Sequence, residues 1–203
     1  MPAEWWPGLA AGLTLVAGAL AWARFPPQLS AAEIGLVRRN AVRSAALGSL
    51  LAVGAALVAL VVLRFPPMLD APVRYVPIAE AAPGALLLRA FVLTPLDTAI
   101  PEELAYRGVL LGRLRRTAEI AHAVLLSAAA FTLSHAVIVL ATIGQTNVRA
   151  DLALLGAIGA YAAVFAGGVI FAVLRIWTGH LAAPIAAHAT FNAAVLVGLS
   201  FGG

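Results

Sequence analysis

The sequence predicts an all-α membrane protein, a polytopic bundle of about six transmembrane helices with its active site within the membrane. Of its 203 residues, 63% are hydrophobic and only 11% are charged, whereas soluble domains have about 25% charged and 45–50% apolar residues. Apolar segments recur at a length near the roughly 20 residues that a spanning helix requires. Three short polar patterns lie within these segments, where each charge costs several kcal/mol and is therefore a functional candidate.

Six candidate spans cover residues 6–23, 45–63, 85–96 with a continuation through the Glu102 region, 121–143, 152–177 and 181–201. The third span is the most irregular, because charged residues and prolines interrupt it, namely Arg89, Pro95, Asp97 and Pro101. Since proline lacks a backbone donor, Pro101 is expected to kink or break this helix just before the glutamates.

All thirteen basic residues are arginines that punctuate the apolar spans and do not gather on one soluble face. This distribution argues against a nucleic-acid partner and for the lipid bilayer. The loops after spans one, three and five hold eight arginines, namely Arg24, Arg38, Arg39, Arg43, Arg113, Arg115, Arg116 and Arg175. The opposite loops hold only three, Arg64, Arg74 and Arg149. The positive-inside rule then places the first set in the cytoplasm and both termini outside.

The segment between the first two spans carries Ser30 and, three residues later, Glu33, the spacing of a capping box. This box is expected to open a short amphipathic helix that carries Arg38, Arg39 and Arg43 on the membrane surface. A plain charged connector is the alternative. The chain has no cysteine, which excludes disulfides, thiolate metal sites and cysteine nucleophiles.

The first polar pattern is Glu102-Glu103-x-x-x-Arg107. On a helix Glu103 and Arg107 share a face, whereas Glu102 points about 100° away. Arg107 is therefore expected to neutralise and orient Glu103, which leaves Glu102 free to face the interior of the bundle. A carboxylate desolvated there suits a general base at neutral pH. The alternative is a salt-bridged helix end that contributes to topology alone.

The other two patterns are Phe131-x-x-x-His135 and His188-x-x-x-Asn192. His135 lies deep in the fourth span, and Phe131, one turn earlier, could cover one side of its ring. A histidine in such a place could equally be a helix-to-helix hydrogen bonder. His188 and Asn192 share one face of the last span and could together hold a ligand or donate two hydrogen bonds to an oxyanion.

Together these side chains supply the parts for two kinds of hydrolytic site. In the first, Glu102 takes a proton from water with help from His135, while His188 and Asn192 stabilise the tetrahedral intermediate of amide hydrolysis. In the second, Glu102, His135 and His188 hold Zn²⁺ or another divalent metal with an open position for water. Both sites need the same residue types, so the sequence leaves the cofactor undecided.

The three patterns, in this order and spacing, resemble the signatures of the CPBP family, the CAAX prenyl protease type II and bacteriocin-processing (Abi) intramembrane proteases. The matching residues are Glu102-Glu103-Leu-Ala-Tyr106-Arg107-Gly108, Phe131-Thr-Leu-Ser-His135 and His188-Ala-Thr-Phe-Asn192. The resemblance covers residues 85–197, and Tyr106 stands where phenylalanine is commoner. Members are often described as metalloproteases, and the role of a metal stays open.

The resemblance implies an intramembrane endopeptidase that hydrolyses a peptide bond of a membrane-associated, CAAX-type lipidated protein or peptide. It implies Glu102 as the catalytic base, completed by His135, His188 and Asn192, with Glu103 and Arg107 in supporting positions. Phe131, beside His135, is added as a third supporting residue. Residues 1–84 would then be N-terminal spans with an interfacial basic loop, and residues 85–203 the catalytic transmembrane domain. The expected location is the plasma membrane, with the cavity opening to the cytoplasm.

Two other functions could use the same residues. A non-catalytic scaffold or bacteriocin-immunity-type protein could bind a peptide in the cavity, although a scaffold has no need for a desolvated glutamate. A small transporter could use Glu102 and His135 as a proton relay, but the spans show no inverted repeats. Arg89 could pair with Asp97 or Glu80, extend to the interface, or receive a substrate carboxylate.

Overall fold

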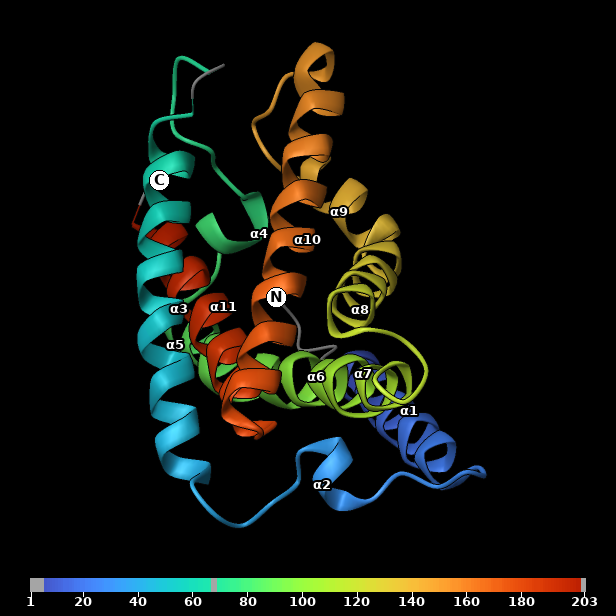
Figure 1. Cartoon of the computed structure of the whole chain (residues 1–203). Coiled ribbons are helices and arrows are strands. Elements are labelled where there is room, and N and C mark those ends of the chain that lie inside the picture. The colour runs from blue at the N-terminus through green and yellow to red at the C-terminus, as the bar shows by residue number, and fades with distance from the viewer. Residues whose placement is uncertain (1–5, 67–68, 202–203) are drawn as a thin grey trace.

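The computed structural model describes residues 6–66 and 69–201, and most of them are helical (Figure 1). Five helices are long and apolar enough to cross a membrane, and a sixth span is present if one bent helix pair counts as a span. Within the described residues the extended pairing is limited to an isolated bridge between Tyr75 and Thr146. The all-α fold with about six spans is therefore confirmed, and the protein is a multi-pass integral membrane protein.

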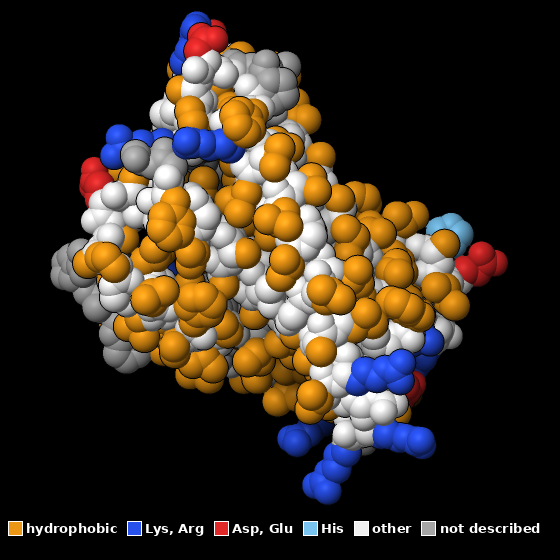
Figure 2. Space-filling view, turned by 90° about the vertical axis from the view of Figure 1, so that its left-hand side faces the viewer, with side chains coloured by type: hydrophobic (Ala, Val, Ile, Leu, Met, Phe, Trp, Pro, Cys, Tyr) orange, Lys and Arg blue, Asp and Glu red, His pale blue; other side chains and the backbone are white. Residues whose placement is uncertain are grey.

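The spans are α1 (Trp6–Arg24), α3 (Ala41–Arg64), a composite helix over Pro83–Leu114, the bent pair α8 (Ile120–Ser134) and α9 (Ala136–Ile143), α10 (Ala153–Thr178) and α11 (Ala182–Ser200). Between them lie the short helices α2 (Ala31–Ile34) and α4 (Val76–Ala79) and the 3₁₀ turn η4 (Ala150–Leu152). Figure 2 shows one face, where hydrophobic side chains form a broad field and arginines gather toward the two ends. Val42 is 85% exposed and Val137 is 82% exposed, which is the surface that a bilayer requires.

The third span remains continuous through its prolines. It consists of α5 (Pro83–Leu88), η1 (Arg89–Leu93), η2 (Pro95–Ala99), α6 (Ile100–Glu103), η3 (Leu104–Leu110) and α7 (Leu111–Leu114), of which η1, η2 and η3 are π-helical. The expectation that Pro101 breaks the helix is wrong, whereas a kink there stays a prediction. The π-helical turns have wider i→i+5 spacing, which accommodates residues that cannot join a regular ladder, and such turns often occur at functional sites.

The sharp bend lies at His135 instead, where α8 and α9 meet at 50°. In a regular helix the Phe131 carbonyl would accept from the His135 backbone N–H. Here it accepts from the Ser134 hydroxyl at 2.7 Å and contacts the His135 ring at 2.8 Å, and the His135 N–H bonds to Thr132. Side-chain groups that compete for a backbone carbonyl in this way bend helices. The histidine expected deep inside one span is therefore at its hinge.

The Ser30–Glu33 capping box is present, but the helix that it opens is short. Gly35, at φ 86°, ends α2 directly after Ile34. Arg38 and Arg39 consequently lie beyond the helix, and Arg43 lies within α3. The predicted amphipathic helix carrying these three arginines is therefore wrong, because a glycine in the left-handed conformation terminates it.

The segment around α2 (residues 22–37) is tied to the other spans by arginines. Arg113 donates to the backbone oxygens of Trp22, Phe25 and Pro27. Arg175, 2% exposed, donates to the oxygens of Ala32, Ile34 and Glu33. Because these arginines follow the third span and end the fifth, the predicted arginine-rich loops do lie on one side (Figure 1).

One of these arginines also binds the capping residue. Arg116 pairs with Glu33 at 2.7 Å. Hydrogen bonds from Arg116, and then from Ser30, lower the pKa of Glu33 to about 2. The Glu33 carboxylate therefore stays ionised, and able to pair with Arg116, at a pH below the ordinary pKa of a glutamate.

At the other end of the bundle, the loop before α4 is hydrogen-bonded to the loop after α9. The backbone N–H of Arg74 donates to the Asn147 side chain at 2.8 Å, and the Asn147 amide donates to Pro72 at 2.9 Å. Inside the bundle, α3 packs closely along α11, where a Cβ added to Gly48 would overlap the carbonyl oxygen of Ala183. This contact fixes the position of α11 relative to α3, and α11 carries His188 and Asn192.

Candidate active site

Glu103 is the buried centre of a polar network. It and Arg107 are 0% exposed, and Nη1 of Arg107 lies 3.0 Å from Oε1 of Glu103. The same Oε1 lies 2.9 Å from Nδ1 of His188, which comes from α11. The four-residue spacing predicted the first contact. Nothing in the spacing of Glu103 and His188 signals the second, since they lie 85 positions apart.

Arg107 joins three spans around this carboxylate. Its Nη2 donates to the backbone oxygen of Gly168 in α10 at 3.2 Å. Its guanidinium carbon lies 4.0 Å from the ring centroid of Phe131 in α8 and 5.4 Å from that of Phe171 in α10. A guanidinium over aromatic faces is stabilised by their electron density. Arg107 therefore holds its charge in the bundle through an ion pair, a carbonyl and two rings.

Glu102 faces the two histidines, as its place on the other side of the helix predicted. Its Oε2 lies 3.8 Å from Nε2 of His135 and 3.9 Å from Nε2 of His188. That oxygen is buried and has no hydrogen-bond partner among the described residues. Residues from three different spans thus converge on one point, which only the tertiary structure could show.

Both imidazoles use Nδ1 to bond a fixed acceptor. Nδ1 of His135 lies 2.8 Å from the Phe131 carbonyl oxygen, and Nδ1 of His188 lies 2.9 Å from the Glu103 carboxylate. A carbonyl and an ionised carboxylate can only accept, so Nδ1 carries the proton in each bond. In a neutral ring Nε2 is then a bare acceptor. The Glu102 Oε2 atom and the two Nε2 atoms therefore face one another, an arrangement that a proton, a hydrogen-bond donor or a cation between them would stabilise.

Aromatic rings enclose this point. The Phe131 ring lies 4.4 Å from the His135 ring and 6.0 Å from the His188 ring, measured between centroids. Phe171 stacks on His188 at 5.2 Å and 26°. The wall predicted for Phe131 is present. Phe171 was missed, because one phenylalanine among many apolar residues of α10 gives no signal in the sequence.

Asn192 lies one turn after His188 in α11 and is half-buried. Its side chain makes no hydrogen bond to the described residues. Because Nδ1 of His188 is bonded to Glu103, only Nε2 is left to act together with the Asn192 amide. The shared oxyanion role of the two residues stays a prediction.

Comparison with known proteins gives the family. A family model described as type II CAAX prenyl endopeptidase Rce1-like matches residues 83–194, which is more than half of the chain and a range that contains all seven predicted site residues. The chain belongs to this family. No curated protein and no solved structure matches it. The resemblance carried by the three polar patterns is therefore confirmed, and Rce1-like membership makes this a protein of a peptidase family.

The side chains predicted to hold a metal, Glu102, His135 and His188, are of the types that bind a divalent ion, but they lie somewhat farther apart than around a bound ion. Ligand atoms around a tetrahedral zinc ion are about 3.4 Å apart, whereas Glu102 Oε2 is 3.8 and 3.9 Å from the two imidazole nitrogens. In residues 6–66 and 69–201, no group of three His, Cys, Asp or Glu side chains is arranged to hold a metal ion. A metal at this site stays a prediction.

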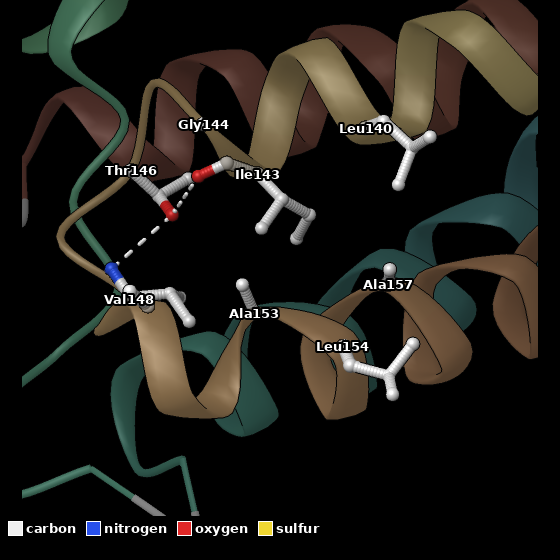
Figure 3. A pocket seen from close by; sticks show the side chains of 9 residues that line it. Leu140, Ile143, Gly144, Thr146, Val148, Ala153, Leu154 and Ala157 are labelled. Atoms are coloured by element: carbon white, nitrogen blue, oxygen red, sulfur yellow. Dashed lines mark hydrogen bonds between the residues drawn. The ribbon is translucent and has the colours of Figure 1, made fainter.

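A cavity of about 430 Å³ lies between α9 and α10, away from this site (Figure 3). Leu140, Ile143 and Leu154 are among its lining residues, and none of the predicted site residues is. The Thr146 hydroxyl at its end donates to the Ile143 oxygen and accepts from the Val148 N–H. Its polar atom is therefore satisfied, and the cavity offers no catalytic group.

Arg89 takes the first of its predicted alternatives. Its Nη1 lies 2.6 Å from Oδ2 of Asp97, whose side chain is 2% exposed, whereas the Arg89 side chain is 44% exposed. The ion pair neutralises Asp97 inside the third span of this Rce1-like chain. Arg89 therefore has this ion pair as one contact, and its role toward a substrate carboxylate stays a prediction.

Proposed function

We propose that the protein is a CAAX-type intramembrane endopeptidase that activates water with Glu102. One observation carries this proposal: a buried, unpartnered carboxylate oxygen that faces two imidazole nitrogens at 3.8 and 3.9 Å. A water molecule there would donate one O–H to Glu102 and be oriented by His135. Family membership supports peptide-bond hydrolysis as the reaction.

The proposed reaction balances with the side chains present. Glu102 takes a proton from water as the water oxygen bonds to the peptide carbonyl carbon. The developing oxyanion accepts hydrogen bonds from the Asn192 amide and from Nε2–H of a protonated His188, whose charge Glu103 would stabilise at 2.9 Å. When the C–N bond breaks, Glu102 returns its proton to the leaving amine with help from His135. The products are a carboxylic acid and an amine.

The proposed substrate is a membrane-anchored protein or peptide that carries a lipid near the scissile bond. The family description names prenyl substrates, and the catalytic residues lie within membrane spans. We further propose that the protein resides in the plasma membrane with this site open to the cytoplasm. The arginine-rich loops support this orientation, since positively charged loops stay in the cytoplasm.

The proposed activity is tested without a guess at the substrate. Cells that make the wild type are compared with cells that make Glu102→Gln at equal levels, and the termini of their membrane proteins are sequenced. Termini found only with the wild type are expected, together with normal folding and insertion of Glu102→Gln. Identical termini in both, with one partner co-purifying equally well, would establish the non-catalytic scaffold instead.

A further inference from the structure

Tyr161, in α10, belongs to none of the three polar patterns, yet its hydroxyl reaches the bend beside His135. It donates a hydrogen bond of 2.6 Å to the backbone oxygen of Ala136, the first residue of α9. Among the described residues this is the one hydrogen bond between α9 and α10. Tyr161 is half-buried within a membrane span, where no water competes for its hydroxyl and an unpaired phenol is costly, so the contact is a stable one.

A second contact holds α8 against α10 on the other side of the bend. A Cβ added to Gly168 would lie 3.1 Å from the Cβ of Ala128, so the two helices touch there. Gly168 follows Tyr161 by seven residues, which is about two turns and the same face of α10. Because α8 and α9 run past this face in the opposite direction, α10 holds the bent pair at two points, Ala128 and Ala136. His135 lies between them, directly before the second.

The same part of α10 contacts the rest of the candidate active site. The Gly168 backbone oxygen accepts from Nη2 of Arg107 at 3.2 Å. Phe171, three residues farther on, stacks on His188 at 5.2 Å. None of the predicted catalytic residues lies in α10 itself. This helix is therefore a common support for the three spans whose side chains converge on Glu102.

Packing holds the two sides of the bend unequally. At Gly168 the approach of α8 leaves no room for a side chain. Beyond the bend, α9 and α10 enclose the cavity of Figure 3, which Leu140 and Ile143 line on one side and Leu154 and Ala157 on the other. Side-chain packing therefore restrains α9 less than α8, and the Tyr161 hydroxyl supplies a restraint at the point where α9 begins.

We propose that Tyr161 is a positioning residue, whose hydrogen bond to the start of α9 fixes the His135 imidazole opposite Glu102. This inference rests on the proposed endopeptidase function, in which His135 orients the attacking water. Nε2 of His135 lies 3.8 Å from Oε2 of Glu102, and a displacement of about 1 Å in a catalytic arrangement can lower a rate about 100-fold. Because Ala136 is bonded directly to His135, loss of the distant hydroxyl alters the site without touching it.

The first experiment removes this hydroxyl alone. Tyr161→Phe is compared with the wild type and with Tyr75→Phe, a matched control whose hydroxyl makes no hydrogen bond to the described residues. Cleavage of a farnesylated CAAX-type peptide is measured in nanodiscs. In Tyr161→Phe kcat should fall by about tenfold or more with KM nearly unchanged, because the peptide still binds while the imidazole that orients water is displaced. An unchanged kcat, or an equal fall in Tyr75→Phe, would overturn the proposal.

A purely structural role of Tyr161 would have a different signature. Interhelical hydrogen bonds in membranes contribute little to stability, so Tyr161→Phe should unfold within about 4 °C of the wild type. A variant with 4-aminophenylalanine at position 161, whose amino group can still donate to Ala136, should recover most of the lost kcat. Loss of folded protein in proportion to the lost activity, or no recovery with the amino group, would refute positioning through this hydrogen bond.

The second experiment does not depend on turnover and so separates this proposal from the proposed function. The chain has four histidines, and the NMR signals of ¹⁵N-labelled histidine report the tautomer and surroundings of each ring. Tyr161→Phe should shift the signals of His135, assigned with His135→Gln, and leave those of His122 and His180 in place, whereas Tyr75→Phe should shift none. Shifted His135 signals in a protein that cleaves no peptide would support the positioning and refute the endopeptidase. Unchanged His135 signals would refute the positioning even in an active enzyme.

Discussion

Two adjacent glutamates of the third span have opposite environments. Glu103 is fully buried and contacts both Arg107 and His188, whereas Glu102 keeps one buried oxygen without a partner. The helix imposes this difference, because neighbouring side chains point about 100° apart. One carboxylate is consequently structural, and the other is available for chemistry.

Replacement of Glu103 by glutamine should therefore destabilise the protein. The neutral amide leaves the Arg107 charge uncompensated in the bundle, and the loss of one partner of a buried ion pair costs about 3–5 kcal/mol. Thermal unfolding in detergent and the yield of folded protein measure this. Glu102→Gln is the matched control, since it keeps the ion pair and should unfold like the wild type. A lower stability of Glu102→Gln than of Glu103→Gln would show that the structural and catalytic roles of the two glutamates are the reverse of those described.

Glu103→Gln should also lower activity, for a separate reason. Glu103 orients His188 through a 2.9 Å contact. A glutamine amide can either accept or donate there, so the imidazole would lose a partner that only accepts and that balances its charge. Single-turnover cleavage by the fraction that remains folded should fall about 10–100-fold, in line with the loss of comparable orienting contacts. Full activity per folded molecule would exclude this positioning role.

Glycines allow neighbouring helices to approach each other closely, and these contacts fix the relative positions of the helices. Gly48 allows α3 to contact the backbone of α11 at Ala183, five positions before His188. In a membrane, where lipid is as apolar as leucine, such contacts drive helix association. The position of α11 along and about its axis relative to α3 therefore depends on Gly48 having no side chain. The position of His188 depends on it in turn.

Gly48→Ala should force α3 and α11 apart. The added methyl overlaps the Ala183 carbonyl, and overpacking of this kind typically costs about 1–3 kcal/mol. Gly54→Ala, in the same helix and with no atom within 4 Å of its added Cβ, should be neutral or slightly stabilising because alanine favours a helix. Thermal unfolding of the two variants checks the difference. Equal stability would contradict the backbone contact.

For the molecule as a whole, the two sets of loops form separate networks at opposite ends. Arg113, Arg116 and Arg175 bind the segment around α2 at one end, and Asn147 binds residues 72–74 at the other. The eight-to-three division of arginines thus corresponds to two real faces of the bundle. The positive-inside rule predicts that the arginine-rich face meets the cytoplasm.

The absence of cysteine makes this orientation easy to measure. Arg39→Cys lies on the arginine-rich side and Asp70→Cys on the other, and both positions are exposed. A membrane-impermeant thiol reagent applied to intact cells should label Asp70→Cys at once and Arg39→Cys only after permeabilisation. Wild-type protein supplies a background free of thiols. Labelling of Arg39→Cys in intact cells would invert the proposed topology.

The sequence by itself determined the membrane class, the approximate spans, the division of arginines between the faces, and the Glu103–Arg107 pair. These properties depend on composition and on spacings of one helical turn, which are local. The sequence also determined the family resemblance, because the order and spacing of the three patterns can be recognised without knowing how the helices pack. The break predicted at Pro101 is absent because the adjacent helical turns are wider than those of a regular α-helix. The amphipathic helix predicted over residues 35–43 is absent because a glycine ends α2 first.

Only the tertiary structure decided how the patterns meet. The contact of Glu103 with His188, the stacking of Phe171 on His188 and the facing of Glu102 toward two imidazoles join residues 17 to 86 positions apart along the chain. No periodicity relates such positions, because their distance depends on the packing of whole helices.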